Sequence, residues 1–525
     1  RGAEFPVSTG QIPDTGHAIV FATPESTHGV ISPVDITGPA VSIARHPHLG
    51  YAKLLVISGR NPSELLQAVN TLTLGKVQLK SEHVAFDRVV IPPRRQPYDA
   101  PMWLKTGEKT RFGDLSGIDR LSVFGLAPGL IPVNFRVPPD LYAEKKTAIP
   151  VHFIDQHVDL PLAANSRLDV GLNRSGIVRF PLGTGGIDKE YSILNDPNAR
   201  TPSMVAYDRQ LHLPLKQLAG INELSFYYDF VVPGEEGPSC VNLYTENTTG
   251  TISPDSTIDL QGFSHYAKMP NLALFANLGF PFTRFADLAE TAVILPENPT
   301  DSDLSEAMNL MGKMGASTGL SVYDISFVTP DDLDQVKGKD LIVIGDIGRQ
   351  PVLERWNDVM PLMVTDEGWE ARDLSWNENL DIWLSSEDYD SAAKAVDLLG
   401  TDAGHPPFMM SFQSPYKPER TVVVLAAAGD ELHQLISVLY QPELVSEIQG
   451  NVAVLSEGNI KSFKTLPPYY LGTLSILSTV RLLMARHLIL FIVSFLLVAF
   501  FAAIFLKLLL ADHSRRRFEI EPLKV

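Results

Sequence analysis

A run near the C-terminus, residues 488–506, contains no charged side chain and one hydroxyl, Ser494. As a helix rising about 1.5 Å per residue it would be roughly 28 Å long, close to the ~30 Å hydrocarbon thickness of a bilayer. A core helix of a soluble protein is the alternative, but such helices seldom run so far without a polar face. The run therefore predicts one transmembrane helix over residues 488–511.

The charges beside this helix predict its orientation. Arg515, Arg516 and Arg517 follow it, whereas only Arg481 and Arg486 precede it closely. Because positively charged flanks stay preferentially in the cytoplasm, the excess predicts a cytoplasmic tail at residues 512–525. The bulk of the chain is then expected on the outer side of the inner membrane.

Small residues on the predicted span indicate more than a tether. Ala499 lies three and four positions before Ala502 and Ala503, so these residues share one helix face. Small side chains let helices approach closely in lipid, where packing drives association. This face is predicted to pack against a transmembrane helix of a partner; a lipid-facing anchor of chance composition is the alternative.

A second helix is predicted immediately before the span, over residues 469–487. At about 100° per residue its apolar side chains gather on one arc, while Ser475, Ser478 and Thr479 lie on the other. We expect it to lie in the membrane interface; an upstream extension of the transmembrane helix is the alternative. The interface arc comprises Leu474, Leu477, Val480, Leu483 and Met484.

Composition limits the class of protein. The 525 residues exceed one ordinary core, so several domains are expected. A formal charge of -18 argues against a nucleic-acid partner, because phosphate binding requires a basic surface. One cysteine, Cys240, allows neither an internal disulfide nor a cysteine-based metal site.

Residues 77–260 are predicted to form a β-sandwich of the jelly-roll kind. Short aromatic or β-branched segments such as 166–172, 177–181 and 223–232 are bounded by Asn, Gly and Pro. Sandwich domains that bind sugars use exposed rings, because a flat ring covers the apolar side of a pyranose. The candidate carbohydrate contacts in predicted loops are Trp103, Tyr98, Tyr142 and Tyr191, although core packing is the default interpretation of each ring.

Residues 261–465 alternate between short apolar strands and amphipathic helices. Strands are predicted at 291–295, 341–344, 380–384 and 421–425, with helices at 304–314, 389–399 and 431–439. Such alternation is typical of a parallel, doubly wound α/β sheet.

An internal repeat supports a second α/β domain. Residues 53–72 and 421–439 share a strand, a Gly-containing turn and a helix that opens Glu-Leu-x-Gln. A repeat at this distance suggests duplicated domains rather than a solenoid. Residues 1–76 hold too few strands for a parallel sheet, so we expect them to be the C-terminal part of an earlier α/β domain.

The search for chemistry finds no catalytic set, metal site or cofactor motif. Asp301-Ser302-Asp303 follows a strand, as in metal-binding D-x-D elements, but Thr300 and Asp303 are placed to cap the next helix. Gly345–Gly348 lacks the Gly-Lys-Ser/Thr of a phosphate loop, and no G-x-G-x-x-G fingerprint occurs. We therefore expect the α/β domains to be non-catalytic scaffolds that bind neither flavin nor nucleotide.

One stretch resembles a known family. Residues 270–295, PNLALFANLGFPFTRFADLAETAVIL, are similar to a signature of the B subunit of bacterial cellulose synthase. The resemblance continues through Pro296-Glu-Asn-Pro299 and agrees with the duplicated layout. That family is built from alternating jelly-roll and flavodoxin-like domains, followed by an interface helix and a membrane anchor. The chain would then begin inside the first flavodoxin-like domain.

The resemblance implies a non-catalytic, periplasmic, tail-anchored subunit. Its implied partners are the catalytic polymerase, the nascent β-1,4-glucan, the inner membrane and further copies of its own periplasmic domains. Two alternatives stay open: an export scaffold for another polysaccharide, and a cyclic-di-GMP-binding regulator, as the family label states. The sequence lacks the paired Arg-x-x-x-Arg and Asp-x-Ser-x-x-Gly motifs of PilZ-type sensors.

Overall fold

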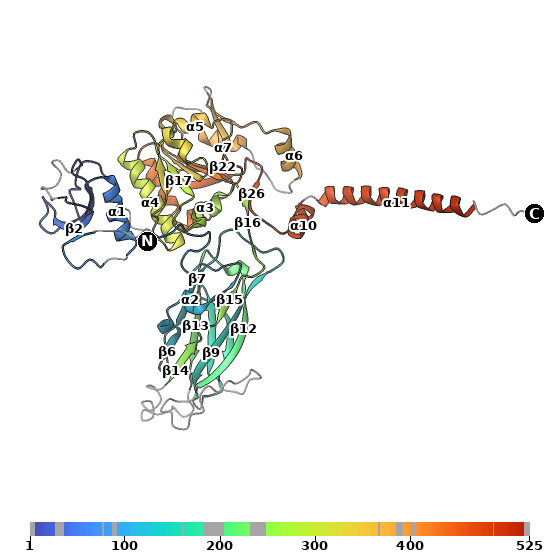
Figure 1. Cartoon of the computed structure of the whole chain (residues 1–525), viewed down its shortest axis with the longest axis horizontal. Coiled ribbons are helices and arrows are strands. Elements are labelled where there is room, and N and C mark those ends of the chain that lie inside the picture. The colour runs from blue at the N-terminus through green and yellow to red at the C-terminus, as the bar shows by residue number, and fades with distance from the viewer. Residues whose placement is uncertain are drawn as a thin grey trace, which may run out of the picture. The chain divides into compact units, whose positions relative to one another are not determined.

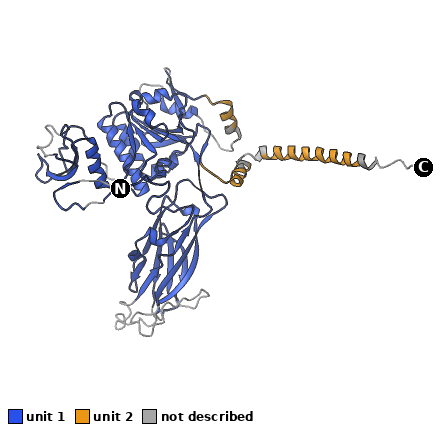
Figure 2. Ribbon diagram, in the orientation of Figure 1, with its two compact units in different colours: residues 1–372, 390–471 blue, residues 373–389, 472–525 orange. Residues whose placement is uncertain are grey.

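The computed structural model divides the chain into two compact units, each coloured separately in Figure 2. Unit 1 comprises residues 1–372 and 390–471; unit 2 comprises 373–389 and 472–525. The structure describes residues 6–26, 36–75, 78–86, 92–159, 162–182, 204–231, 248–365, 368–384, 392–400, 405–486 and 488–518. Figure 1 labels the main elements of both units.

The first sheet of unit 1 has the order β1-β3-β2-β4. Strands β1 and β3 are parallel, whereas β2 runs antiparallel to both β3 and β4. Helix α1 covers one face, where Ala68 packs against Val41 and Ile57. The elements are β1 (Ala18–Ala22), β2 (Ala40–Arg45), β3 (Lys53–Ser58), α1 (Pro62–Thr73) and β4 (His83–Ala85), so this sheet continues beyond the predicted boundary at residue 76.

Two antiparallel sheets around one core form the next part of the chain. Their inner faces share a cluster that includes Phe135, Phe153 and Phe226, all fully buried. One sheet contains β11 (Ser175–Pro181), β10 (Arg167–Leu172), β13 (Ile221–Asp229) and β7 (Ile131–Arg136). The other contains β5 (Lys109–Arg111), β15 (Thr257–Asp259), β9 (Ala148–Val158), β14 (Thr249–Ile252) and β6 (Ser122–Phe124), with β12 (Met204–Pro214) beside β9; α2 (Phe112–Leu115) follows β5.

A seven-stranded sheet forms the α/β part, in the order β18-β17-β19-β23-β22-β24-β25. Its first four strands are parallel, but β22, β24 and β25 pair antiparallel, so the fully parallel sheet that we predicted is wrong in this half. The strands are β17 (Thr291–Ile294), β18 (Ser326–Val328), β19 (Asp340–Ile344), β22 (Phe408–Gln413), β23 (Thr421–Ala426), β24 (Val452–Ser456) and β25 (Asn459–Phe463).

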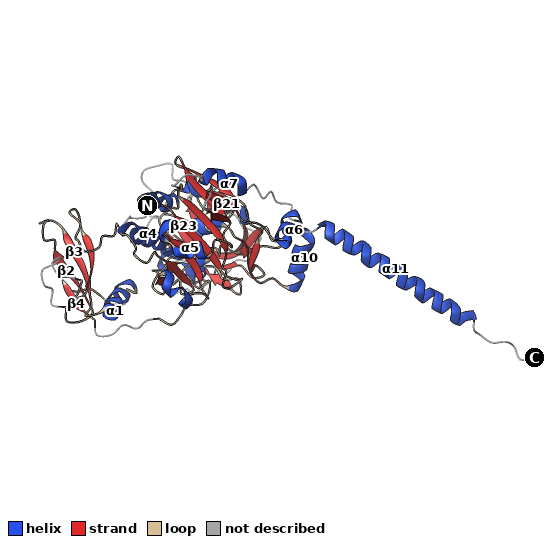
Figure 3. Ribbon diagram, turned by 90° about the horizontal axis from the view of Figure 1, so that it is seen from above, coloured by secondary structure: helices blue, strands red, loops and turns tan. Residues whose placement is uncertain are grey.

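Helices cover both faces of this sheet, which explains why every residue of β17, β19 and β23 is buried. One face packs against α3 (Leu272–Leu278), α4 (Asp301–Thr318), α8 (Glu431–Val438) and α9 (Pro442–Val445). On the other face, Trp356 follows α5 (Pro351–Arg355) and packs on Phe412 of β22. Helix α7 (Ala392–Leu399) and the hairpin of β20 (Leu362–Thr365) and β21 (Gly368–Ala371) complete this part, seen from above in Figure 3.

The structure confirms the internal repeat. In the first sheet β1 is parallel to β3, and β3 is antiparallel to β2; β19, β23 and β22 repeat this arrangement. The antiparallel registers correspond residue by residue, from Ala40↔Ser58 to Arg45↔Lys53 and from Phe408↔Ala426 to Gln413↔Thr421. The repeat therefore extends to the pairing of the strands and is not confined to a short motif.

The strand predicted at residues 380–384 is wrong, because these residues end helix α6 (Trp376–Leu384) in unit 2. A capping box precedes the helix: the Ser375 N–H donates to Glu378 Oε2 (2.8 Å), and the Glu378 N–H donates to Ser375 Oγ (3.3 Å). The Ser-x-x-Glu pattern is the sequence signal of a helix start. The prediction overlooked it and used only the apolar end of the segment.

The interface helix begins later than predicted. Residues Tyr469–Gly472 form β26, which joins β16 (Ser264–Met269) and β8 (Leu141–Tyr142) in a small sheet. Adjacent tyrosines favour a pleated strand, and Leu471 is buried in a cluster with Met269. Helix α10 (Ile476–Arg486) follows, and α11 (Leu488–Phe518) is a separate element.

Candidate functional site

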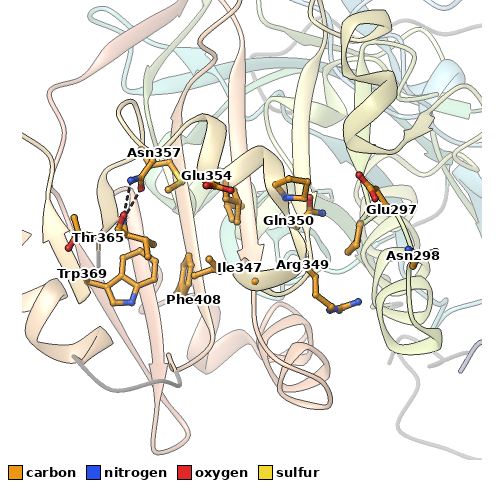
Figure 4. A pocket seen from close by; sticks show the side chains of 17 residues that line it. Glu297, Asn298, Ile347, Arg349, Gln350, Glu354, Asn357, Thr365, Trp369 and Phe408 are labelled. Carbon is orange, nitrogen blue, oxygen red and sulfur yellow. Dashed lines mark hydrogen bonds between the residues drawn. The ribbon is translucent and has the colours of Figure 1, made fainter. Parts of the chain in front are cut away.

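A cavity of about 600 Å³ lies at the carboxyl edge of the parallel strands in the α/β part (Figure 4). The chain leaves β17 through α4 to β18 on one side, and then returns to β19 on the other side of β17. Ligands of α/β proteins bind beside such a reversal of strand order, outside the carboxyl ends of the strands. The cavity is lined by Pro296, Glu297, Asn298, Ile347, Gly348, Arg349, Gln350, Pro351, Leu353, Glu354, Asn357, Met360, Val364, Thr365, Trp369, Phe408 and Val424.

The crevice between β17 and β19 is filled by a glutamine. Gln350 Nε2 donates to the carbonyl oxygens of Ile294 (3.2 Å) and Ile344 (2.7 Å), the last residues of the two strands. Its side chain is fully buried, and Oε1 has no hydrogen-bond partner. Because both acceptors are carbonyl oxygens, the amide nitrogen must face them. Gln350 thus forms a fixed floor beside the cavity.

The start of α4 is satisfied by the protein's own groups. The Asp303 N–H donates to Thr300 Oγ1 (3.2 Å), and the Thr300 N–H donates to Asp303 Oδ2 (2.8 Å). Arg349 Nη2 donates to both oxygens of the buried Asp303 carboxylate, at 3.0 and 2.9 Å. This confirms that Asp303 caps the helix. Among the described residues, no group of three or more His, Cys, Asp or Glu is placed to hold a metal ion.

Aromatic side chains line the end of the cavity that lies away from Arg349. Trp369 of β21 meets Phe408 and His405 at interplanar angles of 84°, with ring centroids 5.3 and 6.3 Å away. Asn357 fixes the neighbouring strand: its Nδ2 donates to Val364 O, and its Oδ1 accepts from Val364 N, both at 2.8 Å. Figure 4 shows Trp369, Thr365 and Asn357 together at this end, with Arg349 and Glu297 at the other.

A second polar cluster lies where the segment before the sandwich meets the small sheet. Thr106 Oγ1 is 3.1 Å from His265 Nε2, and His265 Nδ1 is 3.0 Å from Asp140 Oδ1. This order resembles a nucleophile, base and acid. Tyr98, however, donates its hydroxyl to Asp140 and stacks on His265 with a centroid distance of 3.7 Å. The hydroxyl beside the imidazole belongs to a β-branched threonine, and we assign the cluster to packing.

Unit 2 carries the predicted membrane elements. One described segment, Phe491–Ser514, is long and apolar enough to cross a membrane, and none of its most apolar window is buried. It lies within α11 and contains Ala499, Ala502 and Ala503, all exposed. On α10, Leu477 and Val480 are 60% and 48% exposed, too much apolar surface for a helix that faces water alone. Leu474 precedes the helix, Met484 is half-buried, and the side chain of Leu483 lies outside the described set.

Family comparisons cover most of the chain. A profile described as "Cellulose synthase BcsB, second FD domain" matches residues 265–425. Profiles for the second CBM domain and the first FD domain of the same protein match residues 109–257 and 1–86. The chain belongs to the BcsB family.

Curated relatives agree with this membership. A "Cyclic di-GMP-binding protein" of Xanthomonas axonopodis pv. citri (strain 306) is 33% identical over 98% of this chain and 66% of its own length. The protein of the same name from Escherichia coli (strain K12) is 30% identical with the same coverage. "Cellulose synthase 1" of Komagataeibacter xylinus is 31% identical over 90% of this chain but only 31% of its own length. The BcsB-family chain spans slightly less than two thirds of the first two relatives.

The expected carbohydrate contacts are mostly packed in this BcsB-family chain. Trp103 is 5% exposed and packs with Ala286, so it does not present the free ring that we expected. The ring of Tyr98 is stacked on His265, and Tyr142 is half-buried with its ring edge to Tyr266 at 5.6 Å. Tyr191 lies outside the described residues.

Sequence reasoning missed the cavity itself. Glu354, Asn357 and Trp369 come from α5, the loop after it and β21, none of which has a recognisable motif. One sequence signal could have indicated the cavity: Pro296 and Gly345 begin the loops after β17 and β19, and these two loops meet at one edge of the sheet. The sequence analysis considers these loops only as phosphate loops, whose motif they lack.

Proposed function

We propose that this chain is a non-catalytic, membrane-anchored subunit of bacterial cellulose synthase that supports the catalytic polymerase and guides the emerging β-1,4-glucan through the periplasm. The observation that carries the proposal is the BcsB-family match over the two α/β parts and the sandwich. A protein named cellulose synthase 1 contains a homologue of the chain within a polypeptide about three times longer. Such a fused polypeptide is expected if this kind of chain and the catalytic polymerase work in one assembly.

The architecture supports this role. We assign the sandwich over residues 77–260 to the jelly-roll class, and the sheets within 1–76 and 261–465 to the flavodoxin-like class. Antiparallel sheets around one core and a sheet with helices on both faces fit these classes. The occupied start of α4 and the filled crevice at Gln350 fit a scaffold rather than a nucleotide enzyme.

The apolar helix α11 is an argument for a partner that is itself bound to the membrane. We propose that α11 crosses the inner membrane once with residues 512–525 in the cytoplasm, and that α10 lies in the outer interface with Leu477 and Val480 toward lipid or the partner. The Ala499–Ala503 face would contact a transmembrane helix of the catalytic subunit. Further copies of the periplasmic domains are a weaker candidate partner, which rests on the family resemblance alone.

Cyclic di-GMP binding, stated in the names of two relatives, is not part of the proposal. The chain lacks the paired PilZ-type motifs, and an exported domain would be separated from a cytoplasmic messenger. We place the sensor on the catalytic partner.

Copurification tests the partner and the anchor together. The full chain in mild detergent should retain the catalytic subunit, and replacement of residues 488–506 by polyleucine should weaken that retention at least about tenfold, because close packing needs small residues. The matched control replaces only Phe501 and Ile504 by Leu, on the side of the helix opposite the alanine face. Equal retention by all three versions would show a generic tether, and no retention by any of them would contradict the proposed partnership.

A further inference from the structure

The cavity at the carboxyl edge of the α/β sheet is unsuited to a phosphate-bearing ligand. In α/β proteins phosphate sits at a helix start, where free N–H groups and the helix dipole favour an anion. Here the Asp303 carboxylate already occupies the start of α4 and is held by Arg349. Glu297 and Glu354 add two carboxylates to the lining, against one arginine that is already paired. A nucleotide or flavin phosphate would meet repulsion at this site.

The same cavity has the features of a site for a neutral polyhydroxylated ligand. Its volume lies within the roughly 300–1,000 Å³ of small-molecule sites. Trp369 offers a flat apolar surface, and its orientation is fixed by Phe408. Carboxylates accept strong hydrogen bonds from hydroxyl groups, and Glu297 and Glu354 place two exposed carboxylates at the rim of the cavity.

The cavity is also built rigidly. Gln350 fixes the floor through both strand ends, and Asn357 fixes the hairpin that carries Trp369. A preformed site loses less conformational entropy on binding than a mobile surface does.

We propose that this cavity binds a short segment or an end of a β-linked glucose polymer, with Trp369 stacking on a pyranose and Glu354 and Glu297 accepting hydroxyl hydrogen bonds. The assignment rests on the proposed function, because that function supplies the neutral glucan. It adds a sugar site on the α/β part, outside the sandwich that matches a CBM description. The site is distinct from the rings that sequence reasoning favoured.

Calorimetric titration with cellohexaose tests the proposal on the full chain in detergent. Wild type should bind, Trp369→Ala should weaken this binding at least tenfold, and Trp369→Phe should restore part of it because a flat ring remains. Glu354→Gln should weaken binding less. The control is Trp376→Ala, which removes a 75% exposed tryptophan of α6 that does not line the cavity.

Three results would overturn the assignment. These are no binding by wild type at millimolar cellohexaose, equal binding by wild type and Trp369→Ala, or displacement of cellohexaose by flavin mononucleotide. Equal binding would place the sugar elsewhere, for example on the sandwich. Copurification with the catalytic subunit is measured independently, so a chain that retains the polymerase but not cellohexaose would contradict only the cavity assignment.

Discussion

Replacement of Arg420 by Ala is expected to destabilise the α/β part by about 3–5 kcal/mol. Arg420 is 7% exposed; its Nη1 donates to Asp340 Oδ2 at 2.9 Å, and its Nη2 donates to Glu290. Asp340 also accepts from the Thr421 N–H at 2.8 Å, at the start of β23. Removing the guanidinium leaves the buried Asp340 charge uncompensated, and one amide hydrogen bond cannot replace it.

The measurement is urea unfolding followed by tryptophan fluorescence. Trp356 packs on Phe412 and Trp369 on Phe408, so these two rings report on the α/β part, whereas Trp376 and Trp383 belong to unit 2. Arg355→Ala, an exposed arginine of α5, is the matched control and should change the free energy of unfolding by less than about 0.5 kcal/mol. Adding Asp340→Asn to Arg420→Ala should recover part of the loss, because the buried charge disappears. A loss below 1 kcal/mol in Arg420→Ala would contradict this account.

The same variant has a predicted pH dependence. Burial raises the pKa of the Asp340 carboxyl, and Arg420 and the Thr421 N–H act in the opposite direction. Without Arg420 the pKa in the folded state rises further above the unfolded value of about 3.9. A raised carboxyl pKa favours folding at low pH, and this contribution is lost as pH rises. The destabilisation by Arg420→Ala should therefore be small near pH 4 and grow toward pH 7.

Placing charges on the apolar arc of α10 is expected to uncouple the chain from the polymerase. In Leu477→Asp/Val480→Asp, each replacement removes an apolar side chain worth about 1.5–3 kcal/mol of burial and adds a charge at the interface. Both side chains are exposed in the isolated chain, so folding of unit 1 should be unaffected. Glucan output in cells should fall at least about tenfold.

The control adds the same charges to the polar side. Ser475 Oγ accepts from the Ser478 N–H at 3.1 Å, and Asp can cap a helix in the same way. Ser475→Asp/Thr479→Asp should therefore keep glucan output close to that of wild type. Equal output from wild type and the Leu477/Val480 variant would show that α10 is only a connector.

The sequence predicted the elements that depend on long or repeated patterns. The apolar run of α11 and the strand–turn–helix repeat both follow from hydrophobicity that persists over many residues. Local patterns were less reliable. Residues 469–475 satisfied a helical period, but the pairing of β26 with β16 decides their conformation. The apolar residues 380–384 alone predict a strand, but the cap at Ser375 begins a helix that contains them.

The candidate site was predicted less well because it depends on long-range contacts. Trp103 follows Pro101 and Met102 in a loop, yet its ring is buried against Ala286, far away in the sequence. The half of the α/β sheet beyond β23 is antiparallel, which residue alternation cannot reveal, because parallel and antiparallel buried strands have the same apolar pattern. Trp369 lies in the cavity because β21 pairs with β20 and because Asn357 hydrogen-bonds to Val364 of β20.

If the chain supports glucan synthesis without catalysing it, polymer should form only when the chain and the catalytic subunit are present together. The measurement reconstitutes the catalytic subunit in lipid vesicles with the full chain, and each protein alone. It compares the transfer of labelled glucose from a nucleotide-sugar donor into insoluble polymer. We predict polymer from the pair and at least about tenfold less from either protein alone. Polymer made by the chain alone, or the same rate from the polymerase with and without the chain, would contradict the account.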